Sequence, residues 1–271
     1  MQCNPSTLSA GIKDIEKVLG AALAERDKRN VLLTQVGLEV AHRGRMLLRN
    51  AEGIVDVAAQ HEPMSGEIQL GLIPTISPFL LPRVIPDLKQ QYPNLSMRLY
   101  EEQTDSLLHQ LRSGKIDAVL MAIPFDMGDL QYEFVYKDHF VFACSPNHPL
   151  ANEPGISSEM LATQEIMLLS EGHCLRKHAL DACKFTESDL RSQFEATSLL
   201  TLIQMVSAGM GATLLPSVAA NSHVVRGTNI KMIPLQTTES REIVMVWRKN
   251  YSRQSDCRTI ANVLCNSFAN V

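Results

Sequence analysis

Hydrophobic side chains recur at helical spacing near the start of the chain. Within "NPSTLSAGIKDIEKVLG" the apolar positions lie three or four residues apart: Leu8, Ile12, Ile15 and Leu19. This period is typical of one face of an α-helix. Residues that favour helix boundaries flank the segment: Asn4 as N-cap, Pro5 in the first turn and Gly20 after the end. We therefore predict a helix over residues 4–20, with small and basic side chains on its polar face: Ser6, Thr7, Ser9 and Lys13.

A longer helix is predicted over residues 34–61, after a basic turn and a short apolar strand at Val31–Leu33. No proline interrupts this stretch, and two rows of side chains repeat every seven residues: Val40, Leu47 and Ile54, and Gly44, Ala51 and Ala58. Heptad spacing with small side chains is typical of a helix that packs closely on a partner helix. An internal helix seam is the alternative. The segment 62–66 then breaks the helix and is expected to be a linker.

Beyond residue 67 the pattern alternates between apolar strands and amphipathic helices. Strands are expected at 67–74, 95–102 and 116–124, with helices at 77–93 and 104–114 between them. This βαβ order predicts an α/β fold with a largely parallel sheet. A second α/β lobe is expected to begin near residue 138, and it continues to a strand at 241–249 and a closing helix at 253–269. The predicted domains are 1–33, 34–61 and 67–271.

Composition describes an ordinary globular protein: 45% of the 271 residues are hydrophobic and 20% are charged. No stretch is long and apolar enough for a membrane span, and the N-terminus lacks the apolar region of a signal peptide, so we expect a cytoplasmic location. The six cysteines are then expected to be thiols at rest. Residues 1–50 hold eight Lys/Arg against five Asp/Glu in a chain of net charge −4, which favours nucleic-acid contact at that end.

The segment "SEGHCLRKHALDAC", residues 170–183, concentrates groups that carry chemistry: His173, Cys174, His178 and Cys183. They could be buried structural thiols, zinc ligands or a redox pair. The spacing of the two cysteines differs from that of a zinc knuckle, and "GMG" at 209–211 is too short for a dinucleotide fingerprint. We therefore expect neither a metal nor a cofactor, and read the other four cysteines as core or surface thiols.

Several motifs together resemble the LysR-type transcriptional regulators. "STLSAGIKDIEKVLGAALAERDKRNVLLTQVG" resembles their recognition helix and wing, and "GLIPTISPFLLP" and "VSAGMGATLLP" resemble their effector-lobe signatures. "GHCLRKHALDAC" is similar to the redox segment of the peroxide-sensing, OxyR-like members. The resemblance implies a two-lobed, periplasmic-binding-protein-like effector domain preceded by a linker helix and a partial winged helix-turn-helix.

The resemblance also implies contacts with promoter DNA. The residues expected to make them are Ser6, Thr7, Ser9, Lys13, Arg26, Lys28 and Arg29. LysR-type proteins normally carry two more helices before the recognition helix, which brace it in the groove. This chain starts where the recognition helix should begin, so we expect it to bind operator DNA poorly. Lys177 also stands where an acidic residue is usual, and Ser170 where one is common.

Helix geometry gives the two cysteines of residues 174–183 a switching role. Nine residues of helix separate their Cα atoms by about 13–14 Å along the axis, whereas a disulfide needs about 7 Å or less. Bond formation must therefore unwind or bend the segment. Cys174 is expected at a helix N-terminus beside cationic neighbours, which would favour its thiolate. We assign Cys174 as peroxidatic and Cys183 as resolving, the order that the resemblance also implies.

Five further residues are expected by resemblance to position hydrogen peroxide: Thr75, Thr104, His173, Ser198 and Arg248. For Thr75 and Ser198, helix capping alone is an equally good interpretation. The expected partners are promoter DNA, RNA polymerase, a second or further copies of the chain in a homodimer or homotetramer, and glutaredoxin or thioredoxin as reductant. The alternatives are a LysR-type sensor of a small organic effector and, as an enzyme, a thiol peroxidase.

Overall fold

The fold is described by a computed structural model that covers residues 5–26, 31–58, 62–183, 195–236 and 240–269. The chain divides into two compact units. The first comprises Met1–His61 with Ser113–Lys115, and the second comprises Glu62–Arg112 with Ile116–Val271.

The first unit contains two helices and a two-stranded ribbon: α1 (Pro5–Leu19), β1 (Ala24–Arg26), β2 (Val31–Leu33) and α2 (Gln35–Ala58). The predicted helix boundary at Gly20 is confirmed, because this residue has φ of 66°, the left-handed conformation that glycine adopts at helix ends. The Glu16 carboxylate accepts hydrogen bonds from the amides of Leu23 at 2.8 Å and Ala24 at 3.2 Å. These bonds fasten the end of α1 to the antiparallel ribbon of β1 and β2. The N-cap predicted at Asn4 lies outside the described residues.

The start of α2 is fixed by Thr34 and Gly37. The Thr34 hydroxyl accepts from the Gly37 amide at 2.9 Å, which is an N-cap bond, and donates to the Ala22 carbonyl at 2.8 Å. A Cβ on Gly37 would lie 1.9 Å from the Leu23 carbonyl oxygen. Glycine is therefore required where α2 crosses the ribbon.

Apolar side chains of the first unit remain exposed on both helices. On α1, Leu8, Ile15 and Leu19 are between 47% and 59% exposed, and on α2 Leu47 is 70% exposed. The apolar stripe that the sequence predicts along α1 is thus present but not covered by the described residues.

The second unit alternates strands and helices as the sequence predicts. Its elements are β3 (Gly66–Leu72), α3 (Ser77–Gln91), β4 (Leu95–Glu101), α4 (Thr104–Arg112), β5 (Ala118–Ile123), β6 (Gln131–Cys144), α5 (Ser158–Leu161), β7 (Leu168–Leu169), α6 (Cys174–Cys183), β8 (Glu195–Ala196), α7 (Leu199–Ser207), β9 (Ala212–Pro216), α8 (Ser217–Ala220), α9 (His223–Arg226), β10 (Lys231–Pro234), β11 (Ser240–Trp247) and α10 (Gln254–Ala269).

The prediction of a largely parallel sheet is wrong. The central seven-stranded sheet has the order β10-β6-β11-β5-β3-β4, with β9 also paired to β6. Only the β3–β4 and β3–β5 pairs of this sheet are parallel, whereas β11 runs antiparallel to both β5 and β6. The reason is that the late strand β11 inserts between β5 and β6 and runs opposite to both.

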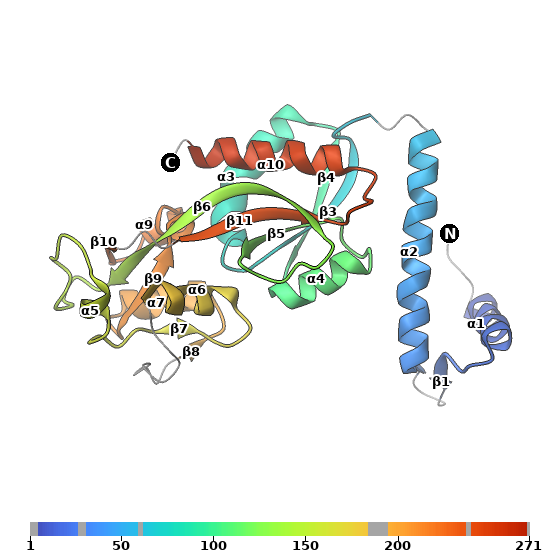
Figure 1. Ribbon diagram of the computed structural model, residues 1–271, viewed down its shortest axis with the longest axis horizontal. Helices are drawn as coiled ribbons and strands as arrows, with labels where there is room; N and C mark the ends of the chain where they lie inside the picture. The colour runs from blue at the N-terminus through green and yellow to red at the C-terminus, as the bar shows by residue number, and fades with distance from the viewer. Residues whose placement is uncertain (1–4, 27–30, 59–61, 184–194, 237–239, 270–271) are drawn as a thin grey trace. The chain divides into compact units, whose positions relative to one another are not determined.

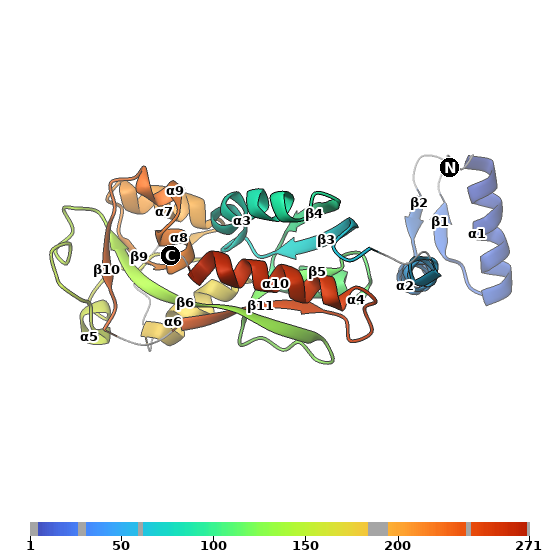
Figure 2. The same ribbon diagram turned by 90° about the horizontal axis from the view of Figure 1, so that it is seen from above.

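Two lobes share these long strands. Figure 1 shows β6 and β11 running from the lobe with β3–β5, α3, α4 and α10 into the lobe with α5–α9. Figure 2 shows α10 beside α3 over the first lobe. Apolar side chains from both lobes form one connected core. The architecture is that of a two-lobed, periplasmic-binding-protein-like effector domain, as the sequence predicts.

No helix in the described ranges has the length and apolar character needed to cross a membrane.

Candidate redox site

The cysteine segment begins with a sharp turn at Gly172. This residue has φ of 88°, and α6 starts two residues later, at Cys174. A Cβ at Gly172 would lie 2.7 Å from the Gln103 side-chain oxygen. The turn before α6 therefore packs against the loop that leads into α4, and this contact brings the two lobes together at the site.

Cys174 is a partly buried thiol at the N-terminus of α6, which confirms the predicted helix position. Burial raises the pKa of this thiol. The Arg241 charge, the Thr104 hydroxyl, and the amides of Leu175 and Cys174 act in the opposite direction but do not outweigh burial.

Arg241, near the start of β11, supplies the positive charge at the thiol. Its side chain is fully buried and forms an ion pair with Asp138 of β6, with Nη2 2.9 Å from Oδ2. It also donates to the Thr75 hydroxyl at 2.8 Å and to the Thr75 carbonyl at 3.2 Å. A buried guanidinium next to a cysteine can stabilise both a thiolate and a departing hydroxide. Sequence reasoning missed Arg241.

Arg248, predicted to serve this role, is engaged elsewhere. Its guanidinium donates to the carbonyls of Leu111 at 2.7 Å and Ile116 at 2.6 Å, and lies 3.8 Å from Asp117. These partners belong to the segment around the end of α4. Arg241 lies within β11, whereas Arg248 directly follows the end of the strand at Trp247.

Two hydroxyls predicted to position peroxide lie deep in the site. Thr75 follows β3 and Thr104 follows β4, and both are at most 2% exposed. Because β3 and β4 are parallel neighbours, their carboxyl ends meet at the same edge of the sheet. Thr75 does not cap α3, whose N-cap is Ile76. The Thr104 hydroxyl acts to lower the pKa of Cys174, and it has no hydrogen-bond partner in the part of the chain that the structure describes.

His173 forms a hydrogen bond with the backbone of Thr197, the residue that precedes Ser198. His173 is 9% exposed; burial lowers its pKa, and a hydrogen bond with the Thr197 backbone opposes this shift. Ser198 occupies the N-cap position of α7 but makes no capping hydrogen bond with its side chain. Ser198 therefore occupies the N-cap position without using its hydroxyl to cap α7.

His178 is a second buried histidine on the same helix face as Cys174, four residues later. It is 6% exposed, and its Nδ1 has no hydrogen-bond partner among the described residues. Its pKa is lowered to about 4, first by burial and then by the charge of Arg241. Its backbone hydrogen bond is with Pro124, which can only accept, so His178 donates. The imidazole is thus neutral and links α6 to the end of β5.

Cys183 is the last residue of α6, so one continuous helix joins the two cysteines. Nine residues of α-helix place their Cα atoms about 13.5 Å apart along the axis. The resting conformation therefore excludes a disulfide between them.

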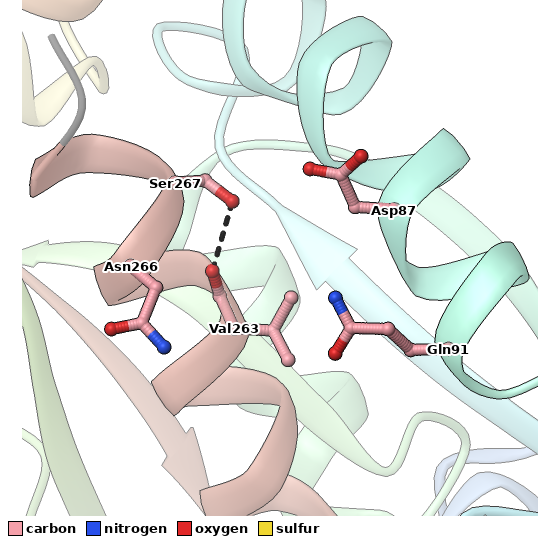
Figure 3. Close-up of a pocket in the computed structure, with 5 residues that line it drawn as sticks. All are labelled: Asp87, Gln91, Val263, Asn266 and Ser267. Atoms are coloured by element: carbon pink, nitrogen blue, oxygen red, sulfur yellow. Dashed lines mark hydrogen bonds between the residues drawn. The ribbon is translucent and has the colours of Figure 1, made fainter.

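Two further thiols and a pocket lie away from these groups. Cys144 and Cys257 are fully buried, and burial together with the charges of Asp117 and Asp256 raises the pKa of Cys257 to about 12. Figure 3 shows a pocket between α3 and α10 with Ser267 bonded to the Val263 carbonyl. The pocket is lined by Asp87, Gln91, Val263, Asn266 and Ser267, and none of these residues was predicted to have a function.

The predicted DNA-contacting residues fall in the first unit. Ser6, Thr7, Ser9 and Lys13 belong to α1, and Lys13 is exposed. Arg26 ends β1, whereas Lys28 and Arg29 lie outside the described residues.

Comparisons with known proteins place the chain in a family. Residues 61–268 match the LysR substrate binding domain. The HTH-type transcriptional regulator EstR of Acinetobacter baylyi is 36% identical over 96% of this chain and 86% of its own length. The hydrogen peroxide-inducible genes activator of Haemophilus influenzae is 36% identical over 99% of this chain and 90% of its own. A full-length OxyR variant from Pseudomonas aeruginosa is similar in structure, with a TM-score of 0.83 and 31% identity over 97% of this chain and 88% of that one. The chain belongs to the LysR family of transcriptional regulators.

Proposed function

We propose that this chain is a hydrogen-peroxide-responsive transcriptional regulator, switched by a Cys174–Cys183 disulfide. The observation that carries the proposal is the position of the two cysteines at opposite ends of α6, with the buried Arg241 and Thr104 side chains acting on the Cys174 thiol. Similarity to a peroxide-inducible activator over 99% of the chain supports it.

The chemistry proceeds in two steps that balance. The Cys174 thiolate attacks one oxygen of hydrogen peroxide, so that an S–O bond forms, the O–O bond breaks, and hydroxide leaves with a proton as water. Cys183 then attacks the sulfenic sulfur, which forms the disulfide and releases a second water. Arg241 stabilises the thiolate and the departing hydroxide, while Thr75, Thr104, His173 and Ser198 orient the peroxide. Arg248 has no part in this scheme.

The switch follows from geometry. Because α6 holds the two cysteines about 13.5 Å apart, the second step requires the helix to unwind. The strain that this leaves makes the disulfide easy to reduce, which suits a thioredoxin or glutaredoxin as reductant. The rearranged lobe would alter how the subunits of a homodimer or homotetramer present their DNA-binding units to promoter DNA and RNA polymerase.

The proposal is tested by titrating the reduced protein with one equivalent of hydrogen peroxide and mapping its disulfides by peptide mass spectrometry. We expect a Cys174–Cys183 crosslink, and in Cys183→Ser a sulfenic acid on Cys174. Protein that consumes peroxide without modification of Cys174 would refute the proposal.

A second candidate is a regulator that binds a small organic effector between the lobes. The similarity to EstR, whose name does not refer to peroxide, favours it. Thermal unfolding in the presence of a panel of metabolites distinguishes the two candidate functions. A ligand that stabilises both the wild type and Cys174→Ser would support this second candidate.

A further inference from the structure

A buried carboxylate holds the guanidinium whose charge acts on the Cys174 thiol. Asp138 Oδ2 accepts from Arg241 Nε at 3.0 Å and from Nη2 at 2.9 Å. Both side chains have no exposed surface. Within a protein interior, an ion pair of this kind stays in place because neither charge can be left alone without a large penalty.

The carboxylate is itself fixed by the start of α8. Asp138 Oδ1 accepts from the Ser217 hydroxyl at 2.8 Å and from the Val218 amide at 3.1 Å. An ionised carboxylate only accepts, so Ser217 is the donor in this bond. The Tyr136 hydroxyl, 2.7 Å from the Ser217 oxygen, must then donate to it. The direction of this hydrogen-bond chain is therefore determined: Tyr136 to Ser217 to Asp138.

The hydrogen-bond chain begins at Tyr136, whose ring stacks on Phe268 of α10, with centroids 4.0 Å apart. At its other end, Arg241 uses four of its five N–H groups on Asp138 and Thr75. The fifth, on Nη1, has no partner among the described residues. It is the donor that remains for an anion at the thiol.

Ionisation of Cys174 would make two anions share one buried cation. Arg241 is the charged group in the described part of the chain that acts on this thiol. While Asp138 already balances that charge, a thiolate gains less from it than it would from an unpaired guanidinium. Asp138 therefore limits how strongly Arg241 activates the Cys174 sulfur.

We propose that Asp138 is a positioning residue for Cys174: it fixes Arg241 toward the thiol and offsets its charge, and so sets how readily the sulfur ionises. This inference rests on the proposed peroxide-sensing function, and it concerns the sensitivity of that site. In the reduced state Asp138 adds to the effect of burial and limits ionisation of Cys174, so that the thiol does not react indiscriminately with oxidants and electrophiles.

The test is the rate of Cys174 alkylation by iodoacetamide as a function of pH, followed by peptide mass spectrometry on the full-length reduced chain. Asp138→Asn keeps the size and one acceptor oxygen but removes the charge. Arg241→Met removes the cation, and the double variant contains a neutral pair. Tyr136→Phe is the matched control, because it keeps the ring on Phe268 and leaves Ser217 able to donate to Asp138.

We expect the pKa of Cys174 in Asp138→Asn to fall by at least one unit relative to the wild type, with about ten-fold faster alkylation at pH 7. The double variant should return toward the wild type, Arg241→Met should lie above it, and Tyr136→Phe should match it. An unchanged pKa in Asp138→Asn overturns the inference. A double variant as reactive as Asp138→Asn also overturns it, since that result would indicate a loosened pocket.

If Asp138→Asn does not fold, the comparison of Arg241→Met with the double variant decides. Arg241→Met leaves the Asp138 carboxyl without its counter-ion, so at pH values where this carboxyl is ionised, its removal in the double variant must lower the pKa of Cys174. An equal or higher pKa in the double variant contradicts the proposal. This measurement uses no peroxide, so a failure of the peroxide-sensing function would be seen separately, as a wild type in which Cys174 does not form a sulfenic acid.

Discussion

Thr104 carries a buried hydroxyl that has no hydrogen-bond partner among the described residues and acts to lower the pKa of the Cys174 thiol. Thr104→Val should therefore cost little stability, under about 1 kcal/mol, because no hydrogen bond of the resting structure is lost. It should slow oxidation of Cys174 by peroxide, since the thiolate loses a donor. Stopped-flow oxidation and denaturant unfolding measure the two effects.

The matched control is Thr213 of β9, which is equally buried. Its hydroxyl donates to the Met167 carbonyl at 2.7 Å. Thr213→Val should lower the free energy of unfolding by about 1–3 kcal/mol, because a buried carbonyl is left unsatisfied, and should leave Cys174 oxidation unchanged. If Thr104→Val oxidises as fast as the wild type, Thr104 has no role at the thiol.

His178 makes the stability of the reduced protein depend on pH. Its pKa is about 4 in the folded chain, against 6.5 for the unperturbed group, so the unfolded state binds the proton more tightly. The stability that His178 contributes is complete above about pH 6.5 and is lost as the pH falls from 6.5 toward 4, by up to about 3 kcal/mol. Urea unfolding at pH 7.5 and pH 5 measures this loss.

His178→Gln should flatten that pH dependence, because a glutamine amide can donate to the Pro124 carbonyl without titrating. His223→Gln, at an exposed histidine of α9, should retain the wild-type profile. Identical profiles for His178→Gln and the wild type would show that His178 is not buried as a neutral group.

Residue types at the site could be predicted better than their contacts. The cysteines and the buried threonines were identified from the sequence, since "GHCLR" and the positions after strands carry them. The choice between Arg241 and Arg248 depends on which face of β11 meets α6, and that depends on strand pairing between residues far apart in sequence. The pKa of Cys174 was misjudged for a similar reason: the sequence shows the adjacent charges but not the burial.

At the scale of elements, close backbone contact makes Gly37 irreplaceable in α2. Because a Cβ would lie 1.9 Å from the Leu23 carbonyl oxygen, Gly37→Ala must displace α2 from the ribbon. We expect the first unit to lose at least about 1–3 kcal/mol of stability. Gly44→Ala, in the same helix with open space around it, should stabilise it by about 0.5–1 kcal/mol. Equal effects of the two changes on thermal unfolding would contradict this account.

Arg176 anchors α6 to its lobe. It donates to the Leu169 carbonyl at 3.0 Å and to Glu195 at 2.8 Å, so it ties the helix to both β7 and β8. Arg176→Met should destabilise the reduced conformation by about 1–2 kcal/mol and make the reduction potential of the cysteine pair more negative by about 20–40 mV.

The neighbouring exposed Lys177 provides the control. Lys177→Met should leave the potential within about 10 mV of the wild type, since it removes no anchoring contact. Equilibration against glutathione measures all three proteins. A potential that rises in Arg176→Met would mean that this residue stabilises the oxidised conformation instead.

Element boundaries were largely predictable because local chemistry sets them. Pro5 and Gly20 bound α1, and Gly172 precedes α6, as their conformational preferences require. Strand partners were not predictable, because β6 and β11 are far apart in the chain yet lie side by side. Their insertion turned an expected parallel sheet into a mixed one.

For the whole molecule, the shared strands explain how a change at one helix can reach both lobes. Arg241 on β11 contacts Thr75 of the first lobe and Asp138 on β6, and Asp138 in turn binds the start of α8. A movement of α6 therefore acts on a residue held by both lobes. This arrangement favours a discrete change between two packed states over a gradual one.

The central claim is that oxidation replaces the helix α6 with a disulfide between its ends. Hydrogen–deuterium exchange of the amides in residues 175–183, before and after one equivalent of peroxide, tests it most directly. We expect slow exchange in the reduced protein, fast exchange after oxidation, and no change in exchange in Cys183→Ser. Slow exchange that persists in protein with a mapped Cys174–Cys183 bond would contradict the account.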